Sequence, residues 1–157
     1  MSASYEWSES NTVSETVTDG ITNLNFGSND SVNLNTTTYP ITAGNASFEK
    51  YIRAKFGSTF TTISNMLFWM SAGTLVTGEA INAAANVAFS TPSATPNADS
   101  AIPTSAGTAL AIQSAAGAAT ITAPGYTKYI RLQLTTTGST PSGAVNQKTF
   151  TFQYDEV

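Results

Sequence analysis

The chain of 157 residues contains no cysteine and no histidine. Without cysteine it can form neither disulfides nor thiolate metal sites. Without either residue, catalysis by a serine–histidine–aspartate or cysteine–histidine arrangement is excluded. Charge is also scarce, since only 10% of residues are charged, against roughly 25% in an average globular domain. The formal net charge of −4 gives no general attraction for phosphate backbones, so we expect no nucleic-acid partner.

Several other sequence signals are missing. The opening MSASYEWSES has neither the basic start nor the apolar run of a secretory signal. No stretch approaches the roughly eighteen apolar residues that a membrane span needs. We therefore expect synthesis in the cytoplasm and no membrane partner. Glycine-rich phosphate loops are absent as well, and we expect no cofactor.

The acidic residues do not form a recognisable catalytic pair. Most of the candidates lie in polar segments without an aromatic cradle, so we interpret them as solvated charges rather than as a glycosidase-type pair. These candidates are Glu6, Glu9, Glu49, Glu79 and Asp99. We predict that the chain is not an enzyme and has no catalytic residue.

Apolar residues alternate with polar ones at period two in three stretches, which is the pattern of a half-buried β-strand. Two of these stretches share the tetrapeptide KYIR, in EKYIRAKF from Glu49 and TKYIRLQL from Thr127, and the third is KTFTFQYDEV. The stretch NMLFWMSAG is instead continuously apolar, as in a strand buried on both faces. The predicted core comprises Ile52, Phe56, Phe68, Trp69, Ile130, Leu132, Leu134, Phe150 and Phe152.

Short strands separated by turns rich in Gly, Pro, Asn and Asp predict an all-β fold. We expect a single-domain antiparallel β-sandwich of the jelly-roll or immunoglobulin-like type, with about seven to nine strands. Residues 15–157 would form this domain, and residues 79–85 could form a helical turn or two because alanine favours helix. The proline-containing segment 90–107 is a long loop, either a surface excursion that grips a neighbour or a disordered connector.

The two KYIR copies contain four of the six lysine and arginine residues, which suggests two interpretations. In the first, they are two sandwich strands with half-exposed tyrosine–arginine faces. In the second, Arg53 and Arg131 are neighbouring contacts for an acidic partner.

The first fourteen residues are polar apart from two aromatic side chains. Tyr5 and Trp7 are the only large apolar groups in MSASYEWSESNTVS, and in an extended chain they point the same way. We predict that residues 1–14 form an extended N-terminal arm that a neighbouring subunit orders by β-addition, with Tyr5 and Trp7 as partner-binding residues.

The segment TDGITNLNFGSNDS contains several side chains of the kind that bind calcium. It concentrates hard oxygen donors at Asp19, Asn23, Asn25, Asn29 and Asp30, which are ligands that calcium prefers. The spacing does not follow the EF-hand pattern, and such turns are ordinary in β proteins. The sequence therefore predicts no metal but leaves calcium binding within residues 19–30 open.

As a whole the chain resembles the small virion structural proteins of tailed bacteriophages. The resemblance rests on the Met-Ser start, the opening ETVTDGITNLNFGSND, the strands SFEKYIRAKF and NMLFWMSAG, and the ending FTFQYDEV. It implies a non-enzymatic subunit of the virion, on the head surface or on the tail. The role it favours is that of a capsid decoration or cement protein that binds the major capsid protein or other virion subunits, as a homo-oligomer within an assembly. The alternative is a carbohydrate-binding or adhesin-type module, in which an exposed aromatic stacks on a sugar.

Overall fold

The structure is a computed structural model that describes residues 3–57, 60–142 and 146–157. The described part contains ten strands and one short 3-10 turn, and no helix in it has the length and apolar character to cross a membrane. The elements are β1 (Tyr5–Asn11), β2 (Thr16–Asp19), β3 (Lys50–Phe56), β4 (Ile63–Ala72), β5 (Glu79–Val87), β6 (Ser100–Ala101), η1 (Ala106–Thr108), β7 (Leu110–Ala111), β8 (Gly125–Tyr126), β9 (Tyr129–Thr136) and β10 (Thr149–Glu156). The number exceeds the expected seven to nine because β6, β7 and β8 are pairings of only two residues.

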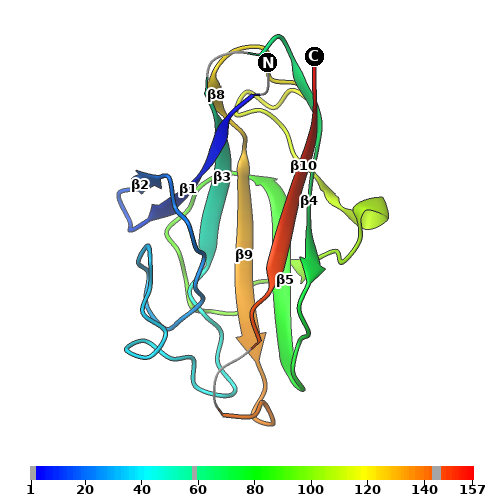
Figure 1. Ribbon diagram of the computed structural model, residues 1–157. Coiled ribbons are helices and arrows are strands. Elements are labelled where there is room, and N and C mark those ends of the chain that lie inside the picture. The colour runs from blue at the N-terminus through cyan, green and yellow to red at the C-terminus, as the bar shows by residue number, and fades with distance from the viewer. Residues whose placement is uncertain (1–2, 58–59, 143–145) are drawn as a thin grey trace.

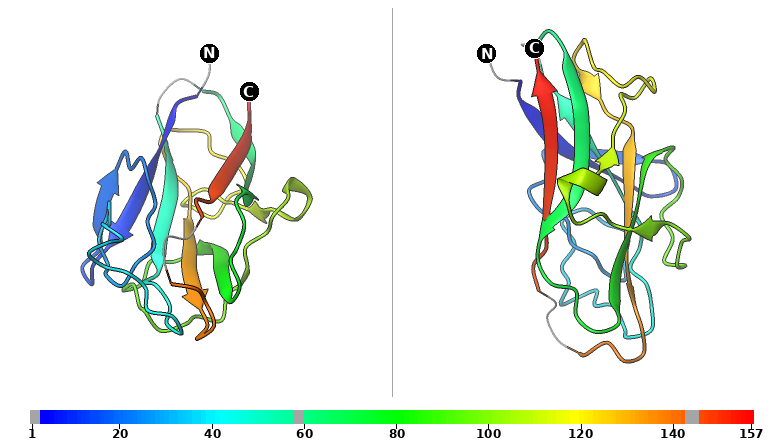
Figure 2. Two further views of the ribbon diagram at one scale, coloured as in Figure 1. Left: turned by 60° about the horizontal axis from the view of Figure 1, so that its bottom comes forward. Right: turned by 90° about the vertical axis from the view of Figure 1, so that its right-hand side faces the viewer.

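The strands form two antiparallel sheets that pack against each other (Figure 1). The larger sheet has seven strands in the order β2-β1-β3-β9-β5-β6, with β8 pairing the end of β3. The smaller sheet has three strands in the order β10-β4-β7. In the right-hand view of Figure 2, β10 and β4 lie on one side of the sandwich and β9 and β5 on the other. The predicted all-β antiparallel sandwich is confirmed.

The two KYIR copies lie side by side in the larger sheet. β3 and β9 are antiparallel neighbours in which Tyr51 pairs with Arg131 and Ile52 with Ile130. The repeat therefore forms two strands of the sandwich, as the first interpretation expected, and the structure shows that these strands are adjacent. The expected half-exposure is wrong for the tyrosines, because Tyr51 is fully buried and Tyr129 is 6% exposed. Phe89 and the chain after it cover this outer face, which no local pattern indicates.

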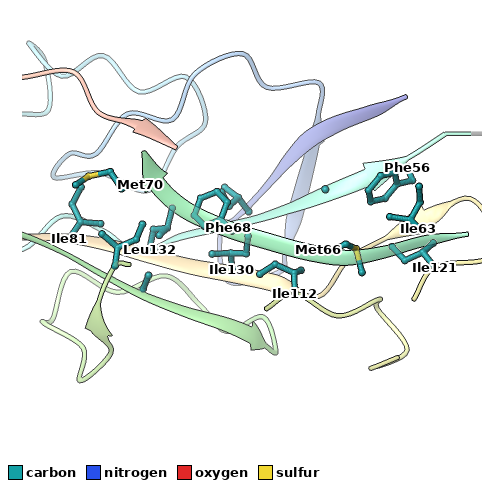
Figure 3. Close-up of a cluster of buried hydrophobic side chains, with 14 of the residues drawn as sticks. Phe56, Ile63, Met66, Phe68, Met70, Ile81, Ile112, Ile121, Ile130 and Leu132 are labelled. Carbon is teal, nitrogen blue, oxygen red and sulfur yellow. The ribbon is translucent and has the colours of Figure 1, made fainter. Parts of the chain in front are cut away.

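The core lies between the sheets and runs along β4 (Figure 3). Most of the predicted core is confirmed, with Phe150 and Phe152 at its margin and six residues fully inside it: Ile52, Phe56, Phe68, Ile130, Leu132 and Leu134. The prediction is wrong for Trp69, which is partly exposed and alternates with the buried Phe68 and Met70. A strand that is buried on both faces needs a covering layer on each side. Trp69 is partly exposed because the outer face of the smaller sheet is not fully covered.

The predicted N-terminal arm is a strand of the domain itself. β1 pairs with β3 from Tyr5–Phe56 to Ser10–Tyr51, and its second half pairs with β2. The expectation that a neighbouring subunit orders residues 1–14 is therefore wrong for the strand. The physical reason is that β3 offers an unpaired edge within the same chain. Residues 1 and 2 lie outside the described residues.

Residues 90–107 are held by their own domain through Gln133. The Gln133 amide nitrogen donates to the carbonyl oxygens of Ser93 and Thr95, and its oxygen accepts from the Asn97 backbone amide at 2.8 Å. The loop is thus neither free nor a connector without contacts.

Residues 79–85 also differ from the helical expectation, since they lie in β5, where Ile81 pairs with Leu134. Sheet pairing overrides the helical preference of alanine there.

Candidate functional site

The two sheets differ in width, which leaves one edge of the sandwich open. β10 is the last strand of the smaller sheet and faces β1 and β3, because the Phe152 ring lies 5.3 Å from that of Trp7 and 6.2 Å from that of Phe56. Beyond β10 the smaller sheet has no further strand in the described residues. The chain after β2 partly covers this gap, with Ile21 and Leu24 packed against the core.

Five aromatic side chains line this open edge. We call Tyr5, Trp7, Phe150, Phe152 and Tyr154 the aromatic seam. The Tyr5 ring centroid lies 5.9 Å from that of Trp7, 5.3 Å from that of Phe152 and 5.7 Å from that of Tyr154, each in an edge-to-face geometry that aromatic pairs favour. Tyr5 is 38% exposed and the other four are partly buried. The seam therefore belongs to the core on one side and meets solvent on the other.

A cavity of about 170 Å³ opens beside the seam. Its walls come from Trp7, Phe68, Phe150 and segment 21–24, and they are mainly apolar, with Thr22 and Asn23 as the polar part. Phe68 and Phe150 are stacked with centroids 5.7 Å apart. Segment 21–24 bonds to β1, because the Ile21 amide donates to the Trp7 carbonyl oxygen at 3.0 Å. The cavity is thus open where β10 ends the smaller sheet.

One edge of β10 carries backbone groups that the described part of the chain does not use. β10 pairs only with β4, and within the described residues no backbone hydrogen bond forms from its other edge between Thr149 and Glu156. The N-terminal segment closes the seam at one end, where the Ala3 amide donates to the Glu156 carboxylate at 2.6 Å and the Tyr154 hydroxyl donates to the Ala3 carbonyl at 3.2 Å. Burial, with Glu156 nearby, raises the pKa of Tyr154.

The structure brings the four predicted partner-binding residues together only as two pairs, which lie on opposite faces of the larger sheet. Tyr5 and Trp7 lie on one face of β1, as their spacing predicts, but they face the chain's own core. Arg131 lies on the outer face of the larger sheet and its guanidinium is engaged within the chain. It bonds the Asp99 carboxylate at 2.6 Å and lies 3.6 Å from that of Glu49. The bond to Asp99 raises the pKa of Arg131.

Arg53 also lies on this outer face but is held by tyrosines. Its guanidinium carbon lies 3.9 Å from the Tyr126 ring centroid and 4.5 Å from that of Tyr129, a cation–π geometry. No ion pair to Arg53 occurs among the described residues. Arg53 and the seam are therefore on opposite faces of the larger sheet, and the four residues do not form one site.

The oxygen donors of residues 19–30 do not converge on one point. Asp19 accepts from Lys55 at 2.7 Å and from Ser8 at 2.5 Å, and these bonds, led by that from Lys55, lower its pKa. Asp30 instead bonds Asn11 and the backbone amide of Thr12, each at 2.7 Å. The described residues contain no group of three or more acidic side chains able to hold a metal ion. The two carboxylates serve the fold separately.

Sequence reasoning placed Phe150 and Phe152 in the core and missed that their strand ends a sheet. The stretch TFTFQYDE contains no proline and no lysine, the residues that commonly protect edge strands from pairing with another chain. Its sequence therefore gave little indication that the strand lies at the edge of a sheet. We compared the chain with protein-family models, with curated proteins and with solved structures, and none of them matches it.

Proposed function

We propose that this protein is a non-enzymatic virion structural protein, a capsid decoration or cement protein that binds the major capsid protein and stabilises the particle. The aromatic seam beside the unpaired edge of β10 is the observation that carries the proposal. Large aromatic side chains that are packed on one side and exposed on the other are typical anchors of protein interfaces. They are costly to leave in water on a free surface.

The distribution of charge supports the same function. Lys50 pairs with Glu9 at 2.7 Å, Lys148 with Glu79 at 2.9 Å and Arg131 with Asp99 at 2.6 Å, and all of these side chains are mostly buried. Glu9 and Glu79 are therefore buried, and their interpretation as solvated charges is wrong, because each pairs with a lysine inside the molecule. The remaining surface, rich in serine, threonine and alanine, suits a protein whose neighbours in an assembly shield it.

Attachment to particles tests the proposal. The purified protein is mixed with capsids that are assembled from the major capsid protein of the same virus and lack the decoration protein, and bound protein is measured by sedimentation. We expect saturable binding that Tyr5→Ser weakens. Tyr39→Ser is the matched control, because Tyr39 is 41% exposed and Tyr5 is 38% exposed. Absence of binding by the wild-type protein, or equal binding by the two folded variants, would contradict the proposal.

Trp69 favours a second candidate, the carbohydrate-binding or adhesin module. Its ring is partly exposed on the outer face of the smaller sheet, and β10 places the hydroxyl of Thr151 across from it. An aromatic face with nearby hydroxyl groups is a plausible sugar platform. Saturable binding on a glycan array that Trp69→Ala abolishes, with the melting temperature unchanged, would favour this function over the capsid one.

A further inference from the structure

We propose that the free edge of β10 accepts an extended strand donated by the partner, and that an apolar side chain of this strand fills the cavity beside the seam. The smaller sheet would then gain a fourth strand next to β10. This inference specifies how the attachment proposed above is made, and it rests on that function for the identity of the partner. Its occupant is an extended segment with apolar residues at alternate positions.

The backbone of β10 offers a free edge to a further strand. β10 runs from Thr149 to Glu156, and the described residues leave its second edge without backbone partners. Strand addition to such an edge gives affinity through main-chain hydrogen bonds. Segment 21–24 lies close by but bonds to Trp7 rather than to β10. The chain therefore covers part of the gap without using the edge.

The cavity beside the seam is large enough for one apolar side chain. Apolar cavities of about 150 Å³ hold a group of the size of benzene. The cavity here measures about 170 Å³, so it has room for one leucine or phenylalanine side chain. A strand beside β10 points every second side chain toward the larger sheet, where Trp7 of β1 and Leu24 of the segment after β2 form the wall. Edge and cavity thus fit a single occupant.

A second copy of β10 does not fit this role. In such a pairing Phe150 and Phe152 of the second copy would already pack in their own core and could not enter the cavity. The donated strand must instead come from a segment whose side chains are free. Asp155 at the end of β10 bonds Asn65 at 2.5 Å and has no cation within ion-pair distance in the described residues. An antiparallel donor with a lysine near its N-terminus would complement this charge.

A synthetic peptide tests the strand addition without particles. The probe has eight residues, begins with lysine and then alternates valine or leucine with threonine, so that its apolar side chains share one face. We expect it to bind the intact protein and to protect the backbone amides of β10 from hydrogen exchange. Two further peptides carry N-methyl groups on every second amide, one for each edge. One of the two should lose at least tenfold in affinity and the other should bind as before.

Two variants test the cavity. Thr22 is exposed and lies at the cavity, so Thr22→Trp should fill the opening and weaken peptide binding at least tenfold. Thr38→Trp places the same ring on an exposed loop elsewhere and should leave binding unchanged.

Three results would overturn the strand addition: no binding at about 1 mM peptide, equal loss with both methylated peptides, or protection outside β10. Concentration-dependent dimers that protect β10 without peptide would show that a second copy is the occupant. Capsid binding by the wild-type protein with any of these results would leave the proposed function standing and reject the strand addition alone.

Discussion

At the scale of single residues, the chain buries charge in the space between the larger sheet and the loop that follows β2. Lys50 precedes the core residue Ile52 by two positions and therefore lies on the same inward face of β3, with its ammonium 2.7 Å from the Glu9 carboxylate. Both side chains are 1% exposed, and Lys50 also donates to the Ser31 carbonyl oxygen at 2.8 Å. A buried pair of this kind gives little net stability, but removing one partner leaves an uncompensated charge.

We expect Lys50→Met to lower the free energy of unfolding by about 3–5 kcal/mol, because Glu9 would stay buried without its cation. The double variant Lys50→Met with Glu9→Leu should recover most of this loss, since no charge is then left unpaired. Urea denaturation of the three proteins measures both effects. A loss below about 1 kcal/mol in the single variant would show that Glu9 reaches solvent.

Tyr129 predicts a dependence on alkaline pH. Burial, and then its hydrogen bond to the Glu15 carboxylate, raise the pKa of Tyr129 to about 12, whereas an unfolded tyrosine has a pKa of about 10. The folded state holds this proton more tightly, so the contribution to stability is complete below pH of about 10 and is lost as pH rises through about 12.

The measurement compares urea denaturation at a pH of about 9 and a pH of about 11.5, which lie on either side of the onset of this loss. The wild-type protein should lose more stability over this interval than Tyr129→Phe. The exposed Tyr39 offers the control, since Tyr39→Phe should lose as much as the wild type. If all three proteins lose the same amount, the proton on Tyr129 is not linked to folding.

At the scale of elements, β1 is a strand of the domain and not a separate N-terminal arm. β1 pairs with β3 over six positions and contributes Trp7 to the core and Glu9 to the buried ion pair. Deletion of residues 1–11 should therefore remove the cooperative thermal transition of the isolated protein, as followed by near-ultraviolet circular dichroism. If the truncated protein melted within a few degrees of the wild type, the pairing with β3 would not hold the domain together.

The sequence predicted the strands whose pattern is local. The period-two rows of Ile52 and Ile130 identified both the strands and the faces that point to the core, because alternation alone determines which side is buried. Burial of Tyr51 was not predictable, since its cover comes from Phe89 and from the segment that Gln133 holds. That segment is polar and rich in proline, and its contacts come from hydrogen bonds that leave no periodic signal.

Trp69 and the aromatic seam are further cases in which the local pattern did not predict how much of a side chain is buried. A continuous apolar run predicted burial of Trp69 on both faces of β4, but burial on the outer face needs a covering layer that the sequence of β4 does not encode. The prediction that Tyr5 and Trp7 lie on one side of the strand was correct. The surface against which they pack was not predictable, because it depends on which strand pairs with β1. The sequence therefore indicated Tyr5 and Trp7, two of the five residues of the seam, as partner-binding candidates, but it did not indicate that the seam lies at the end of a sheet.

At the scale of the whole molecule, the mismatch between the sheets is the feature that organises the site. Seven strands face three, so the sandwich is open where β10 ends the smaller sheet. The aromatic seam, the cavity and the unpaired backbone edge all result from this mismatch. The outer face of the larger sheet, in contrast, is covered by the chain's own loop and ion pairs. The edge at β10 is therefore the surface to which we assign the proposed attachment.

Hydrogen exchange of the protein on capsids, compared with the free protein, shows whether β10 is the site of attachment. We expect attachment to protect the amides of β10 (Thr149–Glu156) and of residues 5–7, while exchange at residues 93–97 on the opposite face of the larger sheet stays the same. Protection that is confined to residues 93–97 and the neighbourhood of Arg53, with β10 unchanged, would contradict this expectation.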